Sequence, residues 1–276
     1  MAGDGDDDAP KNISPREGHD IENRARLRAR VIYEVVRTEG QEDLDRPPFS
    51  LWWSGLAAGL SISFSLLAQA ILTQHLPDAP WRHLVASLGY SVGFIIVVLS
   101  RQQLFTETTI TVVLPLLARF SMRLLGLTGR MWAIVLTANL AGTLVAAAFC
   151  TFAPVISPDL RHEMLELSRH AMAHGWWALA FRGVTAGFLI AAMVWLIPSS
   201  KGSEFQVVLL LTYLIAVGEF AHIVAGSVEG FMLVLAGEMG LGAMAADFVA
   251  PVLLGNITGG TVLFALISYA QVVREM

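Results

Sequence analysis

The chain has 276 residues, of which 55% are hydrophobic and 15% are charged, and its mean hydropathy is +0.60. A soluble domain of this size carries about 25% charged residues, so this composition indicates a chain that is solvated mostly by lipid. The formal net charge of −5 and the lack of a long basic tract argue against a nucleic-acid-binding protein. The presence of only one cysteine excludes a disulfide-stapled secreted module.

The N-terminal part of the chain precedes the first long apolar run. Residues 1–19 are acidic and contain glycine and proline, which is typical of a disordered tail. Residues 20–46 show a helical pattern and predict an amphipathic cytoplasmic helix that lies against the membrane surface or a neighbouring subunit, with a plain solvated helix as the alternative. Pro47 and Pro48 end this helix and open the predicted transmembrane domain, residues 47–276.

The rest of the chain contains six apolar stretches. A bilayer core of roughly 30 Å requires about 20 apolar residues in a helix, and polar residues interrupt the second and fifth stretches. The predicted crossings cover residues 51–73, 84–118, 131–153, 176–197, 205–236 and 248–272. The sequence therefore predicts an all-α membrane protein with six transmembrane helices, of which helices 2 and 5 are broken.

Basic residues between the crossings indicate how the chain is oriented in the membrane. Segments on one side hold seven of them and segments on the other side hold three, which places both termini in the cytoplasm. The seven are Arg37, Arg46, Arg119, Arg123, Arg130, Lys201 and Arg274, and the three are Arg82, Arg161 and Arg169. Because each half contributes three crossings, the halves are inverted repeats, and broken helices at matched positions point to a substrate path near the bilayer midplane.

The interruption of the second crossing, residues 101–109, consists mostly of polar side chains, including Arg101 and Glu107. Irregular backbone at this depth is tolerated only inside the protein or beside water. We therefore expect a helix, a loop and a second short helix, whose hydroxyl groups and free amides replace part of the hydration shell of an ion. A surface loop between two short helices is the alternative.

The interruption of the fifth crossing, residues 218–227, contains Glu219 and His222. A histidine inside a membrane span is costly without water or a partner, so His222 is a functional candidate, and its imidazole can gain and lose a proton in the physiological pH range. Glu219 shares a helical face with His222 if the helix persists that far. A packing histidine that is hydrogen-bonded to a carbonyl group is the alternative.

Asn139 and Asn256 lie within otherwise apolar spans, the third and the sixth. A buried amide needs hydrogen-bond partners, so each side chain is expected either to hold the neighbouring broken helix or to line the path. Glycines at close spacing in the spans, such as Gly55 and Gly59, allow helices to approach one another closely.

Several of these segments together resemble the formate/nitrite transporter family in their order and spacing. The segments are Leu104-Phe105-Thr106, Asn139-Leu140-Ala141-Gly142, the stretch around His222, and Gly255-Asn256-Ile257-Thr258-Gly259-Gly260. The likeness covers about residues 47–273, and residues 52–60 are most similar to the YfdC-type branch. The resemblance implies an aquaporin-like fold of two inverted three-helix repeats. It also implies a homopentamer in which each subunit carries a pore, in a bacterial-type inner membrane.

The resemblance further implies transport of small monovalent weak-acid anions such as formate, nitrite, lactate or hydrosulfide, often with a proton. Residue by residue, it makes Thr106 the hydroxyl of the loop in the second crossing and His222 the central histidine. Leu104 and Phe105 form or border one constriction of the pore. Together with the candidates above, the predicted substrate pathway comprises His222, Thr106, Leu104, Phe105, Phe94, Ile215, Asn256, Asn139, Arg101, Glu107 and Glu219.

The chain departs from the family pattern beside both motifs, which affects the substrate more than the fold. The departures are Arg101, Gln102 and Gln103 before the Leu-Phe-Thr motif, Glu107 after it, Ala221 and Glu219 before His222, and Gly226 after it. Arg101 and Glu107 flank the same loop and could pair across it. An unpaired Arg101 would instead raise anion occupancy, and an unpaired Glu107 would oppose anion entry.

A mechanism follows from an ionisable ring among apolar residues. A bare anion pays a large solvation penalty in an apolar constriction, whereas a neutral weak acid pays far less, so proton sharing at His222 would ease the crossing. The expected partners are this small anionic or weak-acid substrate, the lipid bilayer and further copies of the chain. We expect no cofactor, no metal and no nucleic acid.

An enzyme within the membrane is one alternative. Residues 162–166 resemble the start of a zinc-protease helix, but the fifth position is Glu166 rather than histidine. His170 and His174 could hold a metal together with His162 or Glu166. The alternating charged and apolar residues of this segment favour a short helix on the membrane surface, so we expect the protein not to be an enzyme.

Two further alternatives share the predicted fold. A neutral-solute or water channel is disfavoured because the paired Asn-Pro motifs of aquaporins are absent from the sequence and because a histidine such as His222 would be unexpected in its pore. A non-transporting membrane scaffold or sensor stays open because of the departures around Thr106 and His222.

Overall fold

The computed structural model describes Ser14 and residues 27–275, and none of the described residues forms a β-strand. Apart from Ser14, the predicted disordered tail, residues 1–19, lies outside the described residues, and so do residues 20–26 of the predicted amphipathic helix. Within the described part, five helices are long and apolar enough to cross a membrane. A sixth crossing is assembled from two helices that are each too short alone.

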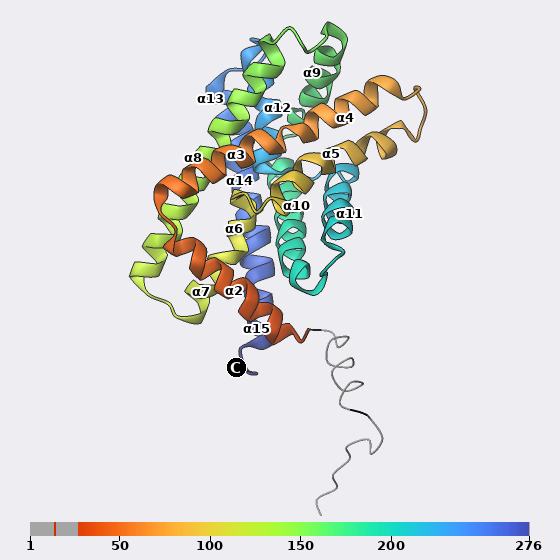
Figure 1. Cartoon of the computed structure of the whole chain (residues 1–276). Helices are drawn as coiled ribbons and strands as arrows, with labels where there is room; N and C mark the ends of the chain where they lie inside the picture. The colour runs from red at the N-terminus through yellow and green to blue at the C-terminus, as the bar shows by residue number, and fades with distance from the viewer. Residues whose placement is uncertain (1–13, 15–26, 276) are drawn as a thin grey trace, which may run out of the picture.

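Figure 1 shows the helices of the six crossings packed around one another, with the hairpin of α4 and α5 projecting to the right in this view. In chain order they are α3 (Pro48–Ile62) with α4 (Phe64–His75); α5 (Arg82–Leu99), α6 (Phe105–Thr111) and α7 (Val113–Ala118); α8 (Met122–Phe152); α10 (Trp176–Leu196) with η1 (Ile197–Ser199); α11 (Glu204–Val217) with α12 (Ile223–Leu235); and α13 (Leu241–Ala243), η2 (Met244–Val249), α14 (Ala250–Ile257), η3 (Thr258–Ala265) and α15 (Leu266–Val272). Within residues 27–275, the prediction of six crossings with breaks in the second and fifth is confirmed.

Both breaks are shorter than the sequence predicted. The chain is irregular only over residues 100–104 and 218–222, and helix resumes at once with α6 and α12. The polar residues of α6 are tolerated in a helix because Thr108 and Thr109 donate hydrogen bonds from their hydroxyl groups to carbonyl groups one turn earlier, at 2.6 and 2.7 Å. Ser227 does the same in α12, at 2.5 Å.

Two helices lie outside the crossings, at opposite ends of the molecule (Figure 1). Helix α9 (Pro158–Met172) begins after Ser157, whose hydroxyl group accepts a hydrogen bond from Leu160 N–H at 3.2 Å. Helix α2 (Ala29–Asp45) lies at the end that also carries α15 and the C-terminus.

Helix α2 packs on α6, α7 and α15 of its own chain, where the sequence predicted contact with the membrane surface or another subunit. This packing is close because Gly40 faces the backbone of α6: a Cβ atom at this position would lie 1.8 Å from Thr111 O. The other side of the N-terminal segment exposes Leu27, Val31 and Val35. This second apolar stripe is the part that stays available for lipid or a neighbouring subunit.

The two halves pack in the same way around matched glycines. Helix α3 packs against α8, and α10 packs against α14. A Cβ atom on Gly59 would lie 2.2 Å from Asn139 O, and a Cβ atom on Gly187 would lie 2.3 Å from Asn256 O. Only glycine permits this approach, which brings each asparagine next to a break.

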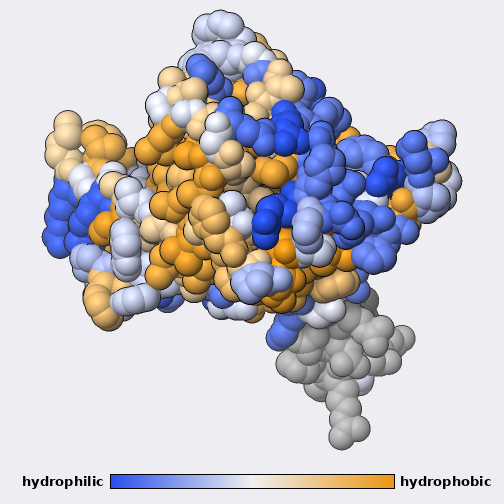
Figure 2. All heavy atoms as spheres, turned by 90° about the horizontal axis from the view of Figure 1, so that it is seen from above, coloured by the Kyte–Doolittle hydropathy of each residue, from blue (hydrophilic) through white to orange (hydrophobic). Residues whose placement is uncertain are grey.

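The surface of the molecule carries many large apolar side chains. Figure 2, a view from above, shows hydrophobic residues over the middle of this face and hydrophilic residues gathered mostly on one side. The most exposed aromatic and aliphatic residues of the crossings include Phe149, Phe152, Trp177, Phe181, Leu210 and Ile267. Such a surface requires lipid or further protein around it.

Candidate functional site

The breaks in the second and fifth crossings have the same backbone geometry. Arg101 and Glu219 have φ values of +54° and +51°, in the left-handed region that favours glycine. In each break, the amide after this residue donates a hydrogen bond to the carbonyl group five positions earlier, at 3.0 and 2.9 Å. This is the turn that ends a helix and normally contains glycine, so both positions hold a charged side chain at a cost in backbone strain.

The side chain of Asn139 holds the first break in place through three hydrogen bonds. Its Oδ1 accepts a hydrogen bond from Phe105 N–H at 2.9 Å, which satisfies an amide at the start of α6. Its Nδ2 donates to Gln103 O at 2.9 Å and to Gly55 O at 2.8 Å. The side chain is fully buried, and these bonds connect the break to α3.

Asn256 fastens the second break with the same set of bonds. Its Oδ1 accepts from Ile223 N–H at 2.9 Å, and its Nδ2 donates to Ala221 O at 2.9 Å and to Gly183 O at 2.8 Å. This side chain is also fully buried. The sequence left open whether the two asparagines hold the broken helices or line the path. These hydrogen bonds support the first role.

The breaks bring Thr106 and His222 together in the middle of the protein. Thr106 Oγ1 and His222 Nε2 are 2.7 Å apart, and both residues are buried. The other ring nitrogen of His222, Nδ1, accepts a hydrogen bond from Ala225 N–H at 3.1 Å and so caps α12. Since Nδ1 is an acceptor, the neutral ring carries its proton on Nε2 and donates it to the threonine oxygen.

Apolar side chains surround this contact. The ring of Phe94 meets the imidazole of His222 edge-on, with centroids 4.9 Å apart. Ile215 lies on α11 just before the second break, and Leu104 and Phe105 form the end of the first break and the start of α6. All four apolar residues are buried.

A cavity of about 110 Å³ lies on one side of this contact and is called the α9-side cavity here. Its walls come from α4, α5, α9, α11 and α12, and they include His222, Glu219, Tyr90 and Glu229. The sequence placed Glu219 and His222 on one helical face only if the helix persisted, and this condition is not met because α11 ends at Val217. The turn at Glu219 directs its carboxylate towards α9.

Three cationic or titratable side chains meet the carboxylate of Glu219. Arg182 Nη1 lies 3.2 Å from Oε2 and donates to the backbone oxygen of Glu219 at 2.7 Å. His170 Nε2 lies 3.2 Å from Oε1, and His174 Nε2 lies 3.8 Å from Oε2. Burial and the neighbouring Arg182 lower the pKa of His174 below its usual value.

A second cavity, of about 370 Å³, lies on the other side and is called the α2-side cavity here. Its walls come from α2, the first break, α6 and α10. Arg101 Nη2 lies 3.0 Å from Glu39 Oε1, and Gln103 Nε2 donates to Asp43 Oδ1 at 2.6 Å. Both contacts connect the first break to α2.

The sequence left open whether Arg101 and Glu107 pair across the loop, and in the structure they do not. Arg101 pairs with Glu39 rather than with Glu107, because α2 brings its own carboxylates to the break. Among the described residues, no group forms a hydrogen bond with the buried Oε1 of Glu107. Burial raises the pKa of Asp43 above its usual value, against the opposing effects of Arg46 and the hydrogen bond from Gln103.

Sequence reasoning missed the partners that come from other elements. Glu39 and Asp43 lie in α2, which was not expected to reach the break. Arg182 lies within the fourth crossing, where an arginine requires a partner, and that signal in the sequence could have pointed to Glu219. The third member of the group around His170 and His174 is Glu219, and neither His162 nor Glu166 takes that place.

Comparisons with known proteins agree with this architecture. The family model described as formate/nitrite transporter matches residues 30–270. The chain is 40% identical over 255 residues to the inner membrane protein YfdC of Escherichia coli, which covers 92% of this chain and 82% of the relative. It is 26% identical over 245 residues to the formate channel FocA of Haemophilus influenzae, covering 79% of this chain and 85% of that protein.

A solved structure shares the fold. It is described as a pentameric formate channel with formate bound, and it superposes with a TM-score of 0.67 at 19% identity, covering 82% of this chain and 98% of that chain. The family match spans all six crossings and both breaks. The chain therefore belongs to the formate/nitrite transporter family and is a multi-pass inner membrane protein.

Proposed function

We propose that the protein conducts small monovalent weak-acid anions along a path from the α9-side cavity, past His222 and Thr106, to the α2-side cavity. The observation that carries this proposal is the 2.7 Å contact between Thr106 Oγ1 and His222 Nε2, where the breaks meet. His222 lines one cavity, and Glu107, the residue after Thr106, lines the other. The names of the relatives, among them a formate channel, support an anion of this class.

His222 offers a hydrogen-bond donor to an anion. Because Ala225 N–H holds Nδ1, the proton of the neutral ring is on Nε2 and faces Thr106. An oxygen of a carboxylate or of nitrite can replace the threonine oxygen as the acceptor, and the threonine hydroxyl can then donate to the same anion. The start of α12 adds the positive end of a helix dipole beside the ring.

Apolar packing makes proton sharing necessary. Phe94, Leu104 and Ile215 are fully buried apolar side chains, so a bare anion that passes them would lose part of its hydration without replacement. While Nε2–H holds the anion by a hydrogen bond, a proton that arrives from the α9-side cavity converts the substrate to a neutral acid, and the ring keeps its own proton and stays neutral. The neutral acid crosses the apolar region at a lower cost. The proton is then carried along or returned.

The remaining expectations are parts of the same proposal. The distribution of basic residues between the crossings supports a cytoplasmic position for the end that carries α2 and the C-terminus. The exposed apolar side chains of the crossings suit five chains in a ring, each with its own path, as in the solved formate channel described as pentameric. The α9-side cavity then opens away from the cytoplasm.

The test is a flux assay on purified protein in liposomes. Wild type, His222→Asn and His162→Asn are compared with formate, nitrite, lactate, urea and glycerol over a range of pH. Asparagine keeps a cap for α12 but cannot share a proton, and His162 is an exposed control on α9. We expect anion flux in wild type and in the control, with a pH dependence that is lost in His222→Asn. Flux of urea or glycerol in place of the anions would contradict the proposal.

A further inference from the structure

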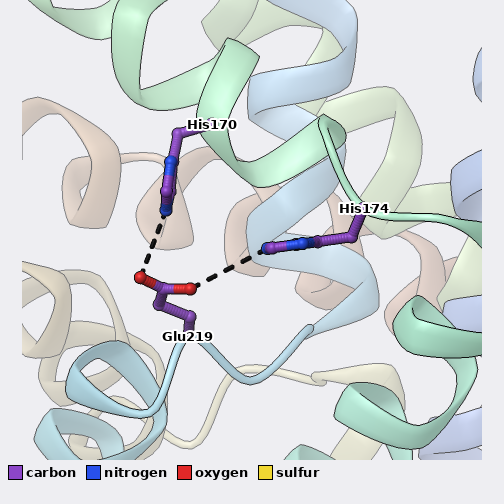
Figure 3. A group of neighbouring side chains, drawn as sticks. All are labelled: His170, His174 and Glu219. Carbon is purple, nitrogen blue, oxygen red and sulfur yellow. Dashed lines mark hydrogen bonds and ion pairs between the residues drawn. The ribbon is translucent and has the colours of Figure 1, made fainter.

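Three side chains from different parts of the chain converge at the edge of the α9-side cavity. His170 is in the last turn of α9, His174 lies just before α10, and Glu219 is in the second break. Their ligand atoms lie within 4.8 Å of one another. Figure 3 shows the two imidazole rings pointing at the two carboxylate oxygens, one ring to each oxygen.

We propose that His170, His174 and Glu219 form a site for a divalent transition-metal ion of the Zn²⁺ type. Two imidazole nitrogens and one carboxylate oxygen are a donor set that zinc uses with three protein ligands and one open position. The nitrogen content distinguishes the site from those of Ca²⁺ and Mg²⁺, which prefer oxygen ligands. The open position can hold water or an oxygen of an anion.

The distances suit this donor set. Bonds of about 2.0–2.1 Å in a tetrahedron place neighbouring ligand atoms roughly 3.3 Å apart, close to the 3.2 Å between His170 Nε2 and Glu219 Oε1. His174 Nε2 lies 3.8 Å from the other carboxylate oxygen, Oε2, so the His174 ring and the carboxylate must shift to place all three ligand atoms around one ion. The side chain of His170 is 64% exposed and can rotate towards the ion.

The charges around the site act in both directions. Arg182 Nη1 lies 3.2 Å from Glu219 Oε2 and repels a cation, so a bound ion has to compete with this ion pair. Glu238 lies near the same end of the molecule, but Arg169 already pairs with it. Glu219 also pairs with Arg182, but it is the carboxylate that both imidazole rings contact.

A bound ion would connect α9 to the second break. Glu219 is three residues before His222, and both residues line the same cavity. The ion and its fourth ligand would occupy the edge of this cavity and hold the break in place. We therefore expect the metal to slow anion flux. This effect on flux rests on the proposed function, but the binding of the metal is independent of it.

The binding test uses the full chain in detergent micelles or nanodiscs, with no histidine tag. Calorimetry with ZnCl₂ and the visible absorption of Co²⁺ report on affinity and coordination. We expect one ion per chain in wild type and a loss of affinity of about tenfold or more in His170→Ala and Glu219→Gln. His162→Ala, on the exposed side of the same helix, should bind as wild type does. No binding at micromolar metal, or equal binding by His170→Ala, would overturn the site.

The flux test adds ZnCl₂ to liposomes that contain wild type or His170→Ala. We expect inhibition of wild type that EDTA reverses and that is weaker by the same factor in the variant. Equal inhibition of both proteins would show that zinc acts at another site, and it would overturn the proposal that this metal site slows anion flux. If the metal-free protein carries no anion flux, the proposed function fails, while the calorimetry still decides the metal site.

Discussion

Arg101 and Glu219 occupy equivalent positions in the two breaks, 118 residues apart, and carry opposite charges in the same left-handed conformation. Phe105 and Ile223, whose amides bond to the two asparagines, are separated by the same interval. On one side of the protein Arg101 meets α2, and on the other side Glu219 meets Arg182 and the end of α9. The repeated turn thus connects each break to a different peripheral helix through a side chain that a glycine could not supply.

Substitutions at Arg101 distinguish the free-energy cost of the left-handed backbone from the stabilisation that the arginine side chain contributes. A non-glycine residue in the left-handed region costs about 1–2 kcal/mol, whereas an exposed ion pair such as Arg101–Glu39 contributes about 0–1 kcal/mol. We expect Arg101→Gly to unfold at a temperature equal to or higher than that of wild type, and Arg101→Ala at a lower one. A thermal melt in which the glycine variant is the less stable of the two would contradict this reading of the turn.

The two asparagines should be equally important for stability. Each is fully buried and makes three hydrogen bonds, so truncation leaves buried backbone groups without partners, at a cost of roughly 2–4 kcal/mol. We expect Asn139→Ala and Asn256→Ala to lower the melting temperature by similar amounts. Thr258→Val is the control, because the half-buried Thr258 donates its hydroxyl hydrogen bond to the Leu254 carbonyl one turn earlier. A large loss for only one asparagine would argue against equivalent roles.

The matched glycines provide a third test. Ala at Gly59 or Gly187 would push its Cβ atom into the backbone of the opposite helix, where the available distances are only 2.2 and 2.3 Å. Both substitutions should therefore destabilise the protein and disturb the neighbouring break. Gly126→Ala is the matched control: nothing lies within 4 Å of the new Cβ, so it should stabilise α8 by about 1 kcal/mol. The measurement is the melting temperature of each of the three variants in a mild detergent, compared with that of wild type.

The docking of α2 should depend on pH through Asp43. Burial raises the pKa of this carboxyl above its value in the unfolded chain, so the docked helix binds the extra proton. The docking free energy is therefore greatest below the unfolded pKa and is reduced as the pH rises through the folded pKa. Hydrogen exchange of α2, corrected for intrinsic rates, should show weaker protection at pH 7 than at pH 4.

Asp43→Asn is the corresponding variant. The neutral amide carries no charge to bury and still accepts a hydrogen bond from Gln103, so we expect α2 protection at pH 7 at least equal to that of wild type. Its dependence on pH should be smaller. An unchanged pH dependence in Asp43→Asn would assign the effect to other groups of α2.

The sequence predicted the crossings and singled out His222 because both depend on local patterns. Apolar runs of the right length and their polar interruptions are visible in the letters, and a histidine within a span indicates a site without any structure. The meeting of Thr106 and His222 followed from the resemblance to the formate/nitrite transporter family, which matched these two positions to known parts of that fold.

The errors concern interactions between distant parts of the chain. The polar residues of α6 were assigned to the first break, which made the predicted break longer than the observed one. These residues are helical because the hydroxyl groups of Thr108 and Thr109 bond to carbonyl groups of their own helix, which polarity alone does not reveal. The pairing of Arg101 with Glu39, and of Glu219 with His170, depends on where α2 and α9 lie, and neither position is contained in the hydrophobic pattern.

The most direct measurement of the central claim is the uptake of protons that accompanies anion flux. Liposomes with wild type, Thr106→Val or His222→Asn and an internal pH indicator are given a formate gradient. If the contact between Thr106 and His222 is where the anion shares a proton, wild type will show coupled proton movement, Thr106→Val will show it at a reduced rate, and His222→Asn will lose it. Equal proton movement per anion in wild type and His222→Asn would contradict the account.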